Sequence, residues 1–184
     1  MPSASPADAR TLAILVDNEP GVLARVVGLF SARGYNIESL TVAETDRAAH
    51  TSRITVVTRG DPATIDQIKS QLDRIVSVRQ VIDVTMDPGG VLRELALVKV
   101  RSTGQDRIEA LRVSDIFRAK VIDTTLESFI FEVTGASEKI DAFIELMRPI
   151  GLLELSRTGV LSIHRGVETD LSAVMTPAPI ASTR

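Results

Sequence analysis

The stretch that decides the fold runs from residue 17 to residue 42 and reads DNEPGVLARVVGLFSARGYNIESLTV. Its apolar residues recur on one face of a helix, which predicts a helix over residues 20–33. That face consists of Val22, Leu23, Val26, Val27 and Phe30. Pro20 fits the first helical turn, where its missing N–H costs no hydrogen bond, and Gly34 fits the left-handed position just past the end.

Strands are predicted on both sides of this helix. The predicted strands of the first unit are 12–16, 37–42, 52–58 and 78–85. The middle two form a hairpin, and a second helix begins at Asp61-Pro62. The order is therefore β-α-β-β-α-β, after which the Pro- and Gly-containing residues 86–90 interrupt every pattern.

The same order of elements recurs after this break. The predicted helices cover 105–117 and 137–148, the second with Ser137 as its N-cap. The predicted strands are 92–101, 120–124 and 128–134, with a last one at 160–163 for which 152–155 is the alternative. The sequence thus predicts an α+β fold of two consecutive ferredoxin-like βαββαβ units. Each would be a four-stranded antiparallel sheet with two helices on one face and the other face uncovered.

These units define the expected domain organisation. We expect a disordered N-terminus over 1–9, a first domain over 10–86, a linker over 87–91, a second domain over 92–165 and a flexible tail over 166–184. Units of fewer than about 80 residues have thin cores and open sheets, so self-association through sheet edges or helices is expected.

Composition excludes several classes of protein. The chain of 184 residues has a net charge of −3 and a pI near 5.5, which gives no general attraction to nucleic acid or to anionic membranes. Aromatic residues make up 3%, so we expect an aliphatic core and no stacking platform for bases. Cysteine is absent, the first ten residues resemble no targeting signal, and no run reaches the roughly 18 apolar residues of a membrane span. The default expectation is a cytoplasmic protein.

Catalytic chemistry finds little support in the sequence. His50 and His164 each lack a partner at the spacing that a catalytic histidine needs, so both are interpreted as surface or strand-edge residues. The carboxylates on the predicted strands and helices are interpreted as a solvated face. They are Glu94, Glu132, Asp141 and Glu145. There is no metal-ligand cluster, and the glycines from Gly21 onward lack the GxGxxG order of a dinucleotide site.

The start of the first helix is the remaining candidate site. The backbone N–H groups of Gly21, Val22 and Leu23 have no partner within a helix, and the helix dipole favours an anion there. A carboxylate fits well. Asn18 either binds a ligand or caps the helix, and Asn36, taken by itself, is more typical of a turn.

Three runs of residues closely resemble the regulatory (small) subunit of acetolactate synthase, also called acetohydroxyacid synthase. They are Asn18–Leu23, Arg25–Phe30 and Arg33–Val42, with weaker echoes over 94–100, 116–123 and 156–159. The resemblance extends over about residues 10–166, and the first unit resembles the ACT domain of that family.

The resemblance implies a non-catalytic subunit that activates a thiamine-diphosphate-dependent catalytic subunit and makes it sensitive to valine. The cofactors, thiamine diphosphate, magnesium and FAD, would belong to the catalytic subunit, with none in this chain. ACT domains of the family dimerise and hold valine at the interface. The matching positions are Asn18, Gly21, Val22 and Leu23 from one protomer and Asn36 and Ile37 from the other.

Two alternatives stay open at this stage. In the first alternative the chain is a stand-alone ACT-domain amino-acid sensor that regulates another enzyme or a transcription factor. In the second the chain is an enzyme itself. Leucine and isoleucine also stay open as effectors, because one methylene in an apolar pocket changes binding by only about 1–3 kcal/mol.

Overall fold

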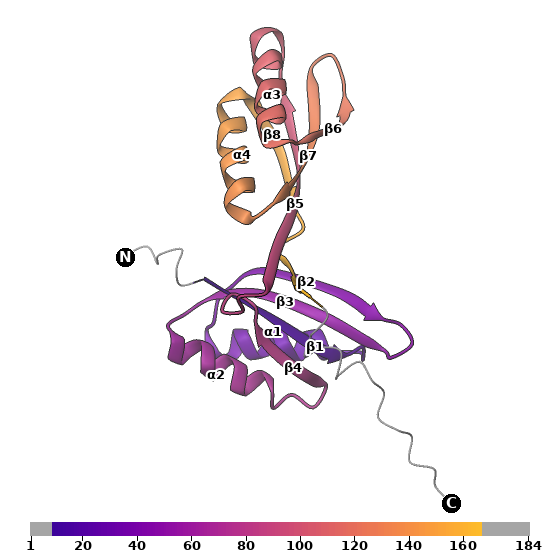
Figure 1. The fold of residues 1–184 in the computed structure, drawn as a ribbon, viewed down its shortest axis with the longest axis vertical. Coiled ribbons are helices and arrows are strands. Elements are labelled where there is room, and N and C mark those ends of the chain that lie inside the picture. Colours follow the sequence, from indigo (N-terminus) through magenta and orange to yellow (C-terminus); the bar gives the residue numbers. More distant parts are fainter. Residues whose placement is uncertain (1–8, 167–184) are drawn as a thin grey trace, which may run out of the picture. The chain divides into compact units, whose positions relative to one another are not determined.

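The computed structural model describes residues 9–166, which fall into two compact units (Figure 1). Within the described residues the first unit contains 9–91 and 162–166, and the second contains Leu92–Leu161. The expected N-terminal segment 1–9 and tail 166–184 lie outside the described residues except for their inner ends, and Ala9 already belongs to the first strand.

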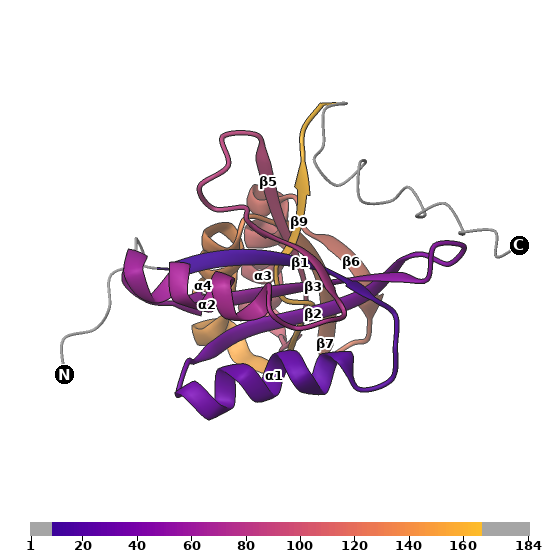
Figure 2. The same cartoon turned by 90° about the horizontal axis from the view of Figure 1, so that it is seen from below.

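The first unit has the predicted β-α-β-β-α-β order. Its elements are β1 (Ala9–Asp17), α1 (Val22–Arg33), β2 (Ile37–Asp46), β3 (Thr51–Arg59), α2 (Pro62–Leu72) and β4 (Val78–Asp83). The strands form an antiparallel sheet in the order β2-β3-β1-β4, and both helices cover one face of it (Figures 1 and 2). The hairpin of β2 and β3 is confirmed, with strands longer than the sequence pattern indicated.

An aliphatic core joins this sheet to its helices. From the sheet it takes Leu12, Ile14, Val16, Ile54 and Val56, and from the helices Val22, Val26, Phe30, Ile65, Ile68 and Leu72. The alternation of side chains along β1 and β3 places these strand residues on one face of the sheet.

The opposite face of this sheet is also buried, which corrects the expectation that it stays uncovered. Thr11, Ala13, Leu15 and Thr55 lie on that face, and each is at most 5% exposed. Part of the cover comes from the returning chain, since Arg53 on this face contacts Ser162. Sequence periodicity did not reveal this because it reports only the face that the two helices cover.

The first helix starts later than predicted. Gly21 is its N-cap with a φ of 83°, a left-handed conformation that glycine adopts without steric cost, so Pro20 lies before the helix and not in its first turn. At the other end Gly34 is left-handed as predicted, with a φ of 70°, and its N–H donates to the carbonyls of the last turn.

The second unit repeats the order with one addition. Its elements are β5 (Gly90–Arg101), α3 (Gly104–Phe117), β6 (Lys120–Thr124), β7 (Ser128–Gly135), α4 (Ser137–Gly151) and β8 (Leu152–Arg157). They are followed by β9 (Leu161–His164), most of which belongs to the first unit. The sheet order is β6-β7-β5-β8, and β9 pairs with β5 as a fifth strand.

Three predictions for this unit need correction. The strand that closes the main sheet order is β8, near the alternative 152–155, because α4 ends at Gly151 and passes directly into it; 160–163 forms the extra strand β9. The N-cap of α4 is Ala136, while the Ser137 hydroxyl instead donates to Glu94 Oε2 at 3.1 Å. The core is also not purely aliphatic, since Phe129, Phe131 and Phe143 are buried in it. Phe131 contacts both Phe129 and Phe143, and Phe143 also contacts Phe117.

Glu94 is not part of a solvated face. It is only 4% exposed, and Arg157 holds it with two hydrogen bonds, Nε to Oε1 at 2.7 Å and Nη2 to Oε2 at 2.6 Å. Arg157 also donates from Nη1 to Asp141 Oδ1 at 2.6 Å. Burial raises the pKa of the Glu94 carboxyl, but hydrogen bonds and charge from Arg157, with help from Ser137, outweigh it and leave the pKa below its ordinary value.

Candidate functional site

The loop that leads into α1 is fixed by backbone hydrogen bonds to two other loops. The Asp17 N–H donates to the Ser77 carbonyl at 2.8 Å, and the Asn18 N–H donates to the His50 carbonyl at 2.7 Å. His50 lies in the turn between β2 and β3, with a left-handed φ of 49°. The start of α1 is therefore held between the tip of the β2–β3 hairpin and the loop before β4.

The first turn of α1 presents free donors. The N–H groups of Gly21 and Leu23 make no hydrogen bond within residues 9–166, whereas the Val22 N–H reaches the Glu19 carbonyl at 3.3 Å. No acidic side chain lies in the first turn, and no side chain caps it. The space beside Gly21 is open, since a Cβ placed there would have no heavy atom within 4 Å. The positive end of the helix is thus open to an external anion.

Glu19, in the loop before the helix, has partners of its own. Its Oε2 accepts from the Ser77 hydroxyl at 3.0 Å and lies 3.6 Å from Arg25 Nη2, which also donates to Ser77 Oγ at 2.9 Å. Because Arg25 pairs with the carboxylate, Glu19 does not neutralise the helix start.

Asn18 does not cap the helix, so the capping interpretation is wrong. It is exposed, and its Nδ2 donates to Glu44 Oε1 at 3.3 Å. This contact leaves the side-chain carbonyl oxygen of Asn18 as an acceptor beside the free N–H groups of the helix start.

The apolar residues of the predicted site differ in orientation. Val22 is 6% exposed and belongs to the core, so only its backbone is available at the surface. Leu23 is 38% exposed. Within one chain, the helix start offers a ligand polar backbone groups, Asn18 and the side chain of Leu23.

Asn36 and Ile37 lie at the far end of α1. The Asn36 carbonyl accepts from the Thr58 hydroxyl at 2.6 Å, while its exposed side chain makes no hydrogen bond to the described residues. Ile37 is half-buried against the core at the first position of β2. The twelve residues of α1 separate these positions from Gly21 by about 18 Å, so no ligand of amino-acid size touches both groups in one chain.

Two family models match the chain. Residues 12–80 match the acetohydroxyacid synthase small subunit-like ACT domain, and residues 93–166 match the small subunit of acetolactate synthase. A probable acetolactate synthase small subunit of Archaeoglobus fulgidus is 46% identical, over 85% of this chain and 96% of the relative. The chain belongs to the acetolactate synthase small subunit family. The isozyme 3 small subunit of Escherichia coli is 43% identical, over 85% of this chain and 96% of its own.

The fold of the family is shared as well. The crystal structure of the acetolactate synthase small subunit from Thermotoga maritima superimposes with a TM-score of 0.78 at 38% identity, covering 87% of this chain and 99% of that one. The two βαββαβ units described above are thus the architecture of a small subunit, the first of them an ACT domain.

Sequence reasoning missed the residues that support the site. Ser77, Arg25 and Glu44 meet the loop before α1 from distant parts of the chain, and no local pattern marks them. His164 was interpreted as lacking a partner, but its Nε2 lies 3.1 Å from Asp87 Oδ2. Among residues 9–166 no helix is long and apolar enough to cross a membrane, and no three His, Cys, Asp or Glu side chains are grouped as metal ligands.

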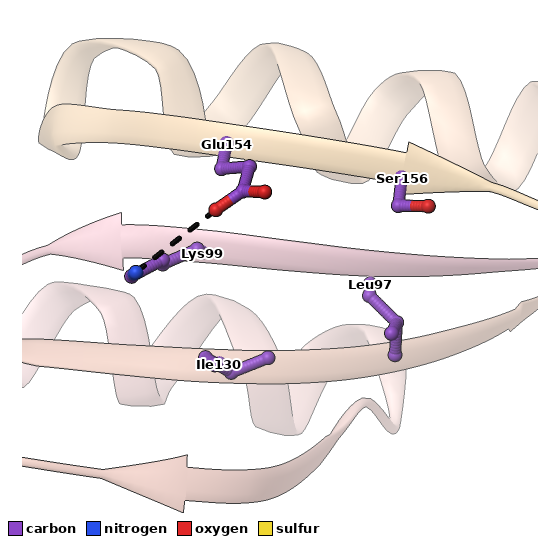
Figure 3. Close-up of a pocket in the computed structure, with 5 residues that line it drawn as sticks. All are labelled: Leu97, Lys99, Ile130, Glu154 and Ser156. Atoms are coloured by element: carbon purple, nitrogen blue, oxygen red, sulfur yellow. Dashed lines mark ion pairs between the residues drawn. The ribbon is translucent and has the colours of Figure 1, made fainter.

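A hollow lies on the second sheet (Figure 3). It measures about 140 Å³ and is lined by Leu97, Lys99, Ile130, Glu154 and Ser156. Ligand pockets usually span about 300–1,000 Å³. Lys99 and Glu154 are cross-strand neighbours that form an ion pair with each other, with Nζ and Oε2 3.9 Å apart. Because these two charges are already paired, this hollow is a weaker candidate for a ligand site than the helix start.

Proposed function

We propose that this chain is the cytoplasmic regulatory subunit of acetolactate synthase, which activates the catalytic subunit and makes it sensitive to valine. Thiamine diphosphate, magnesium and FAD would be bound by that catalytic subunit. The observation that carries the proposal is the start of α1, where free N–H groups of Gly21 and Leu23 occur in a first turn without acidic side chains.

A valine molecule fits the groups available there. Its carboxylate would accept from the helix-start N–H groups, and its ammonium would donate to the Asn18 side-chain oxygen. Its side chain would contact Leu23, the exposed apolar residue of this turn, while Val22 would contribute through its backbone.

The remaining contacts would come from a second protomer. Asn36 and Ile37 lie about one helix length from Gly21 in the same chain. An ACT-domain homodimer that brings the partner's α1 end to this helix start would complete the site. Valine bound at the interface would then have a different affinity for each of two arrangements of the dimer. Regulation by valine requires such a difference in affinity.

The experiment is a reconstituted assay of acetolactate formation from pyruvate. The chain alone should give no product, its addition to the catalytic subunit should raise the rate, and valine should inhibit only the reconstituted enzyme. Leucine and isoleucine, titrated in parallel, determine the effector preference. Capture of a different enzyme from extract, with no effect on the synthase, would instead favour the stand-alone sensor.

Two variants at Gly21 locate the effector site in this assay. Gly21→Asp places a carboxylate beside the donors meant for the ligand and should abolish inhibition while activation persists. Gly21→Asn has the same shape without the charge and tolerates a left-handed backbone, so it serves as the control for strain. Full valine sensitivity of Gly21→Asp would contradict the site.

A further inference from the structure

The hollow on the second sheet combines a charged end with an apolar end. Lys99 and Glu154 face each other across β5 and β8, and Leu97 lies two residues from Lys99 on the same face of β5 (Figure 3). Ile130 of β7 is the neighbour of Lys99 on the other side. The hollow therefore offers a cation, an anion and two apolar side chains in one small region.

The ion pair at the hollow leaves its polar atoms without hydrogen bonds. Lys99 Nζ and Glu154 Oε2 lie 3.9 Å apart, beyond the roughly 2.7–3.2 Å of an N–H···O hydrogen bond. Within residues 9–166 neither group has another partner, and the Ser156 hydroxyl has none. The two charged side chains are 41% and 74% exposed, and an exposed pair contributes little to stability. A ligand can therefore separate them at small cost.

The two opposite charges determine which kind of ligand the hollow can hold. A simple anion attracted by Lys99 is repelled by Glu154, and the reverse holds for a simple cation. A zwitterion avoids this repulsion, because its carboxylate approaches Lys99 while its ammonium approaches Glu154. In an α-amino acid these two groups are held about 3 Å apart by the α-carbon, close to the 3.9 Å between Nζ and Oε2. The four charges then alternate in sign, and each attracts its neighbours.

The size of the hollow limits the side chain of such a ligand. The hollow measures about 140 Å³, and an apolar cavity of about 150 Å³ holds one benzene molecule. A branched side chain of three or four carbons is of this size. It would cover Leu97, which is 37% exposed, and Ile130, which is partly exposed, and so remove apolar surface from water.

We propose that this hollow binds a free α-amino acid with an aliphatic side chain of three or four carbons. The carboxylate accepts from Lys99 Nζ, the ammonium donates to Glu154, and the side chain contacts Leu97 and Ile130. Because both charges are exposed to water, the Kd is on the order of 1 mM. The site lies in the second unit and within one chain, so it does not depend on the effector site at the start of α1.

The test follows the isoleucine methyl signals of the full chain by ¹³C NMR during titration with L-leucine. The Gly21→Asp variant is used, so that the helix-start site is blocked. The Ile130 signal should shift in a saturable way, while Ile37, which belongs to the proposed effector site, should not respond. The analogues 4-methylpentanoate, without the ammonium, and 3-methylbutan-1-amine, without the carboxylate, should each bind about fivefold or more weakly than leucine.

Two lysine variants identify the charge that is responsible. Lys99→Met keeps an unbranched side chain without the charge and should raise the Kd for leucine about fivefold or more. Lys120→Met is the matched control, since Lys120 forms a similar pair with Glu132, at 4.0 Å on the same face, but does not line the hollow. It should change the Kd less than about twofold.

Three results would overturn the proposal. One is an equal loss of affinity in the two lysine variants, and another is leucine binding no tighter than its two analogues. The third is an Ile130 signal that stays unchanged at leucine concentrations about tenfold above the expected Kd. A response of Ile37 in this variant would instead count against the blocked effector site, so the two proposals fail separately.

Discussion

The first helices of the two units, α1 and α3, begin in similar ways and differ in charge. Each follows a strand, and each starts at a left-handed glycine, Gly21 with a φ of 83° and Gly104 with a φ of 55°. Neither glycine has a heavy atom within 4 Å of the place where a Cβ would project. Backbone geometry alone therefore does not distinguish a ligand site from an ordinary helix start.

The side chains of the first turn make the distinction. Asp106 lies in the first turn of α3 and compensates the positive end of that helix from within the chain. The first turn of α1 has no acid, and the nearby Glu19 pairs with Arg25 and Ser77. An external carboxylate therefore has a reason to bind at α1 and little reason to bind at α3.

The units also differ in how they use their polar groups. In the second unit Glu94, Arg157, Asp141 and Ser137 satisfy one another and tie β5, β8 and α4 together. In the first unit Asn36 leaves its side chain without a partner among the described residues. The buried network stabilises the second unit, whereas the side chain of Asn36 remains available to a ligand.

The largest expected effect comes from placing the same substitution at both helix starts. Gly21→Asp should raise the valine concentration for half-inhibition on the order of 100-fold or more, because it removes charge-assisted hydrogen bonds worth ~3 kcal/mol. Gly104→Asp carries a similar backbone strain and should change it less than about twofold. Inhibition curves of the reconstituted enzyme compare the two, and equal losses would mean that strain, not the ligand site, is responsible.

A smaller effect should follow from Glu94→Gln, which removes the charge from the buried network. We expect a loss of about 2 kcal/mol in unfolding free energy, below the usual 3–5 for a broken buried pair because Arg157 is 32% exposed. Glu145→Gln, which affects an exposed pair with Arg148, should cost at most about 0.5 kcal/mol.

Urea unfolding followed with two signals assigns this loss to a unit. The single tyrosine, Tyr35, is in the first unit and there is no tryptophan, so tyrosine fluorescence reports that unit while circular dichroism reports both. The Glu94→Gln transition should move in circular dichroism with the fluorescence transition unchanged. A loss seen equally in both signals would contradict a local role for the network.

The smallest expected effect is a pH dependence of the same network. Because the pKa of folded Glu94 lies below its ordinary value, its stabilisation is complete above the unfolded pKa of about 4.3 and is lost as the pH falls through the folded pKa. The stability difference between the unsubstituted chain and Glu94→Gln should therefore shrink by on the order of 1 kcal/mol below pH 4. A difference that stays constant down to pH 3 would show that the charge of Glu94 is not involved.

Much of the fold could be predicted because it is encoded locally. The left-handed Gly34, the start of α2 at Asp61-Pro62 and the β2–β3 hairpin depend on residues close in sequence, and all are confirmed. The predicted face of α1 is confirmed for Val22, Val26 and Phe30, whereas Leu23 is 38% exposed. Errors occurred where distant residues compete. The Ser137 hydroxyl donates to Glu94 instead of capping α4. The strand β8 takes the place in the sheet that was predicted for 160–163, and its pairing with β5 depends on residues over 50 positions away.

The candidate site could be predicted only in part for the same reason. The free N–H groups of α1 follow from Gly21 and the absence of first-turn acids, which the sequence displays. The core orientation of Val22 and the pairing of Glu19 with Ser77 depend on tertiary packing. The distance between Gly21 and Asn36 follows from the length of α1, and within one chain it keeps the two halves of the site apart.

The central claim, that two chains share each effector site, is tested most directly by mixing two inactive variants. Gly21→Asp and Asn36→Ala should each bind little valine as homodimers, because both sites of each dimer carry one damaged half. After unfolding and refolding together, mixed dimers should hold one intact site, and calorimetry should recover about a quarter of the valine sites of the unsubstituted protein. If the mixture binds no more valine than the two variants apart, the site lies within one chain and the account is wrong.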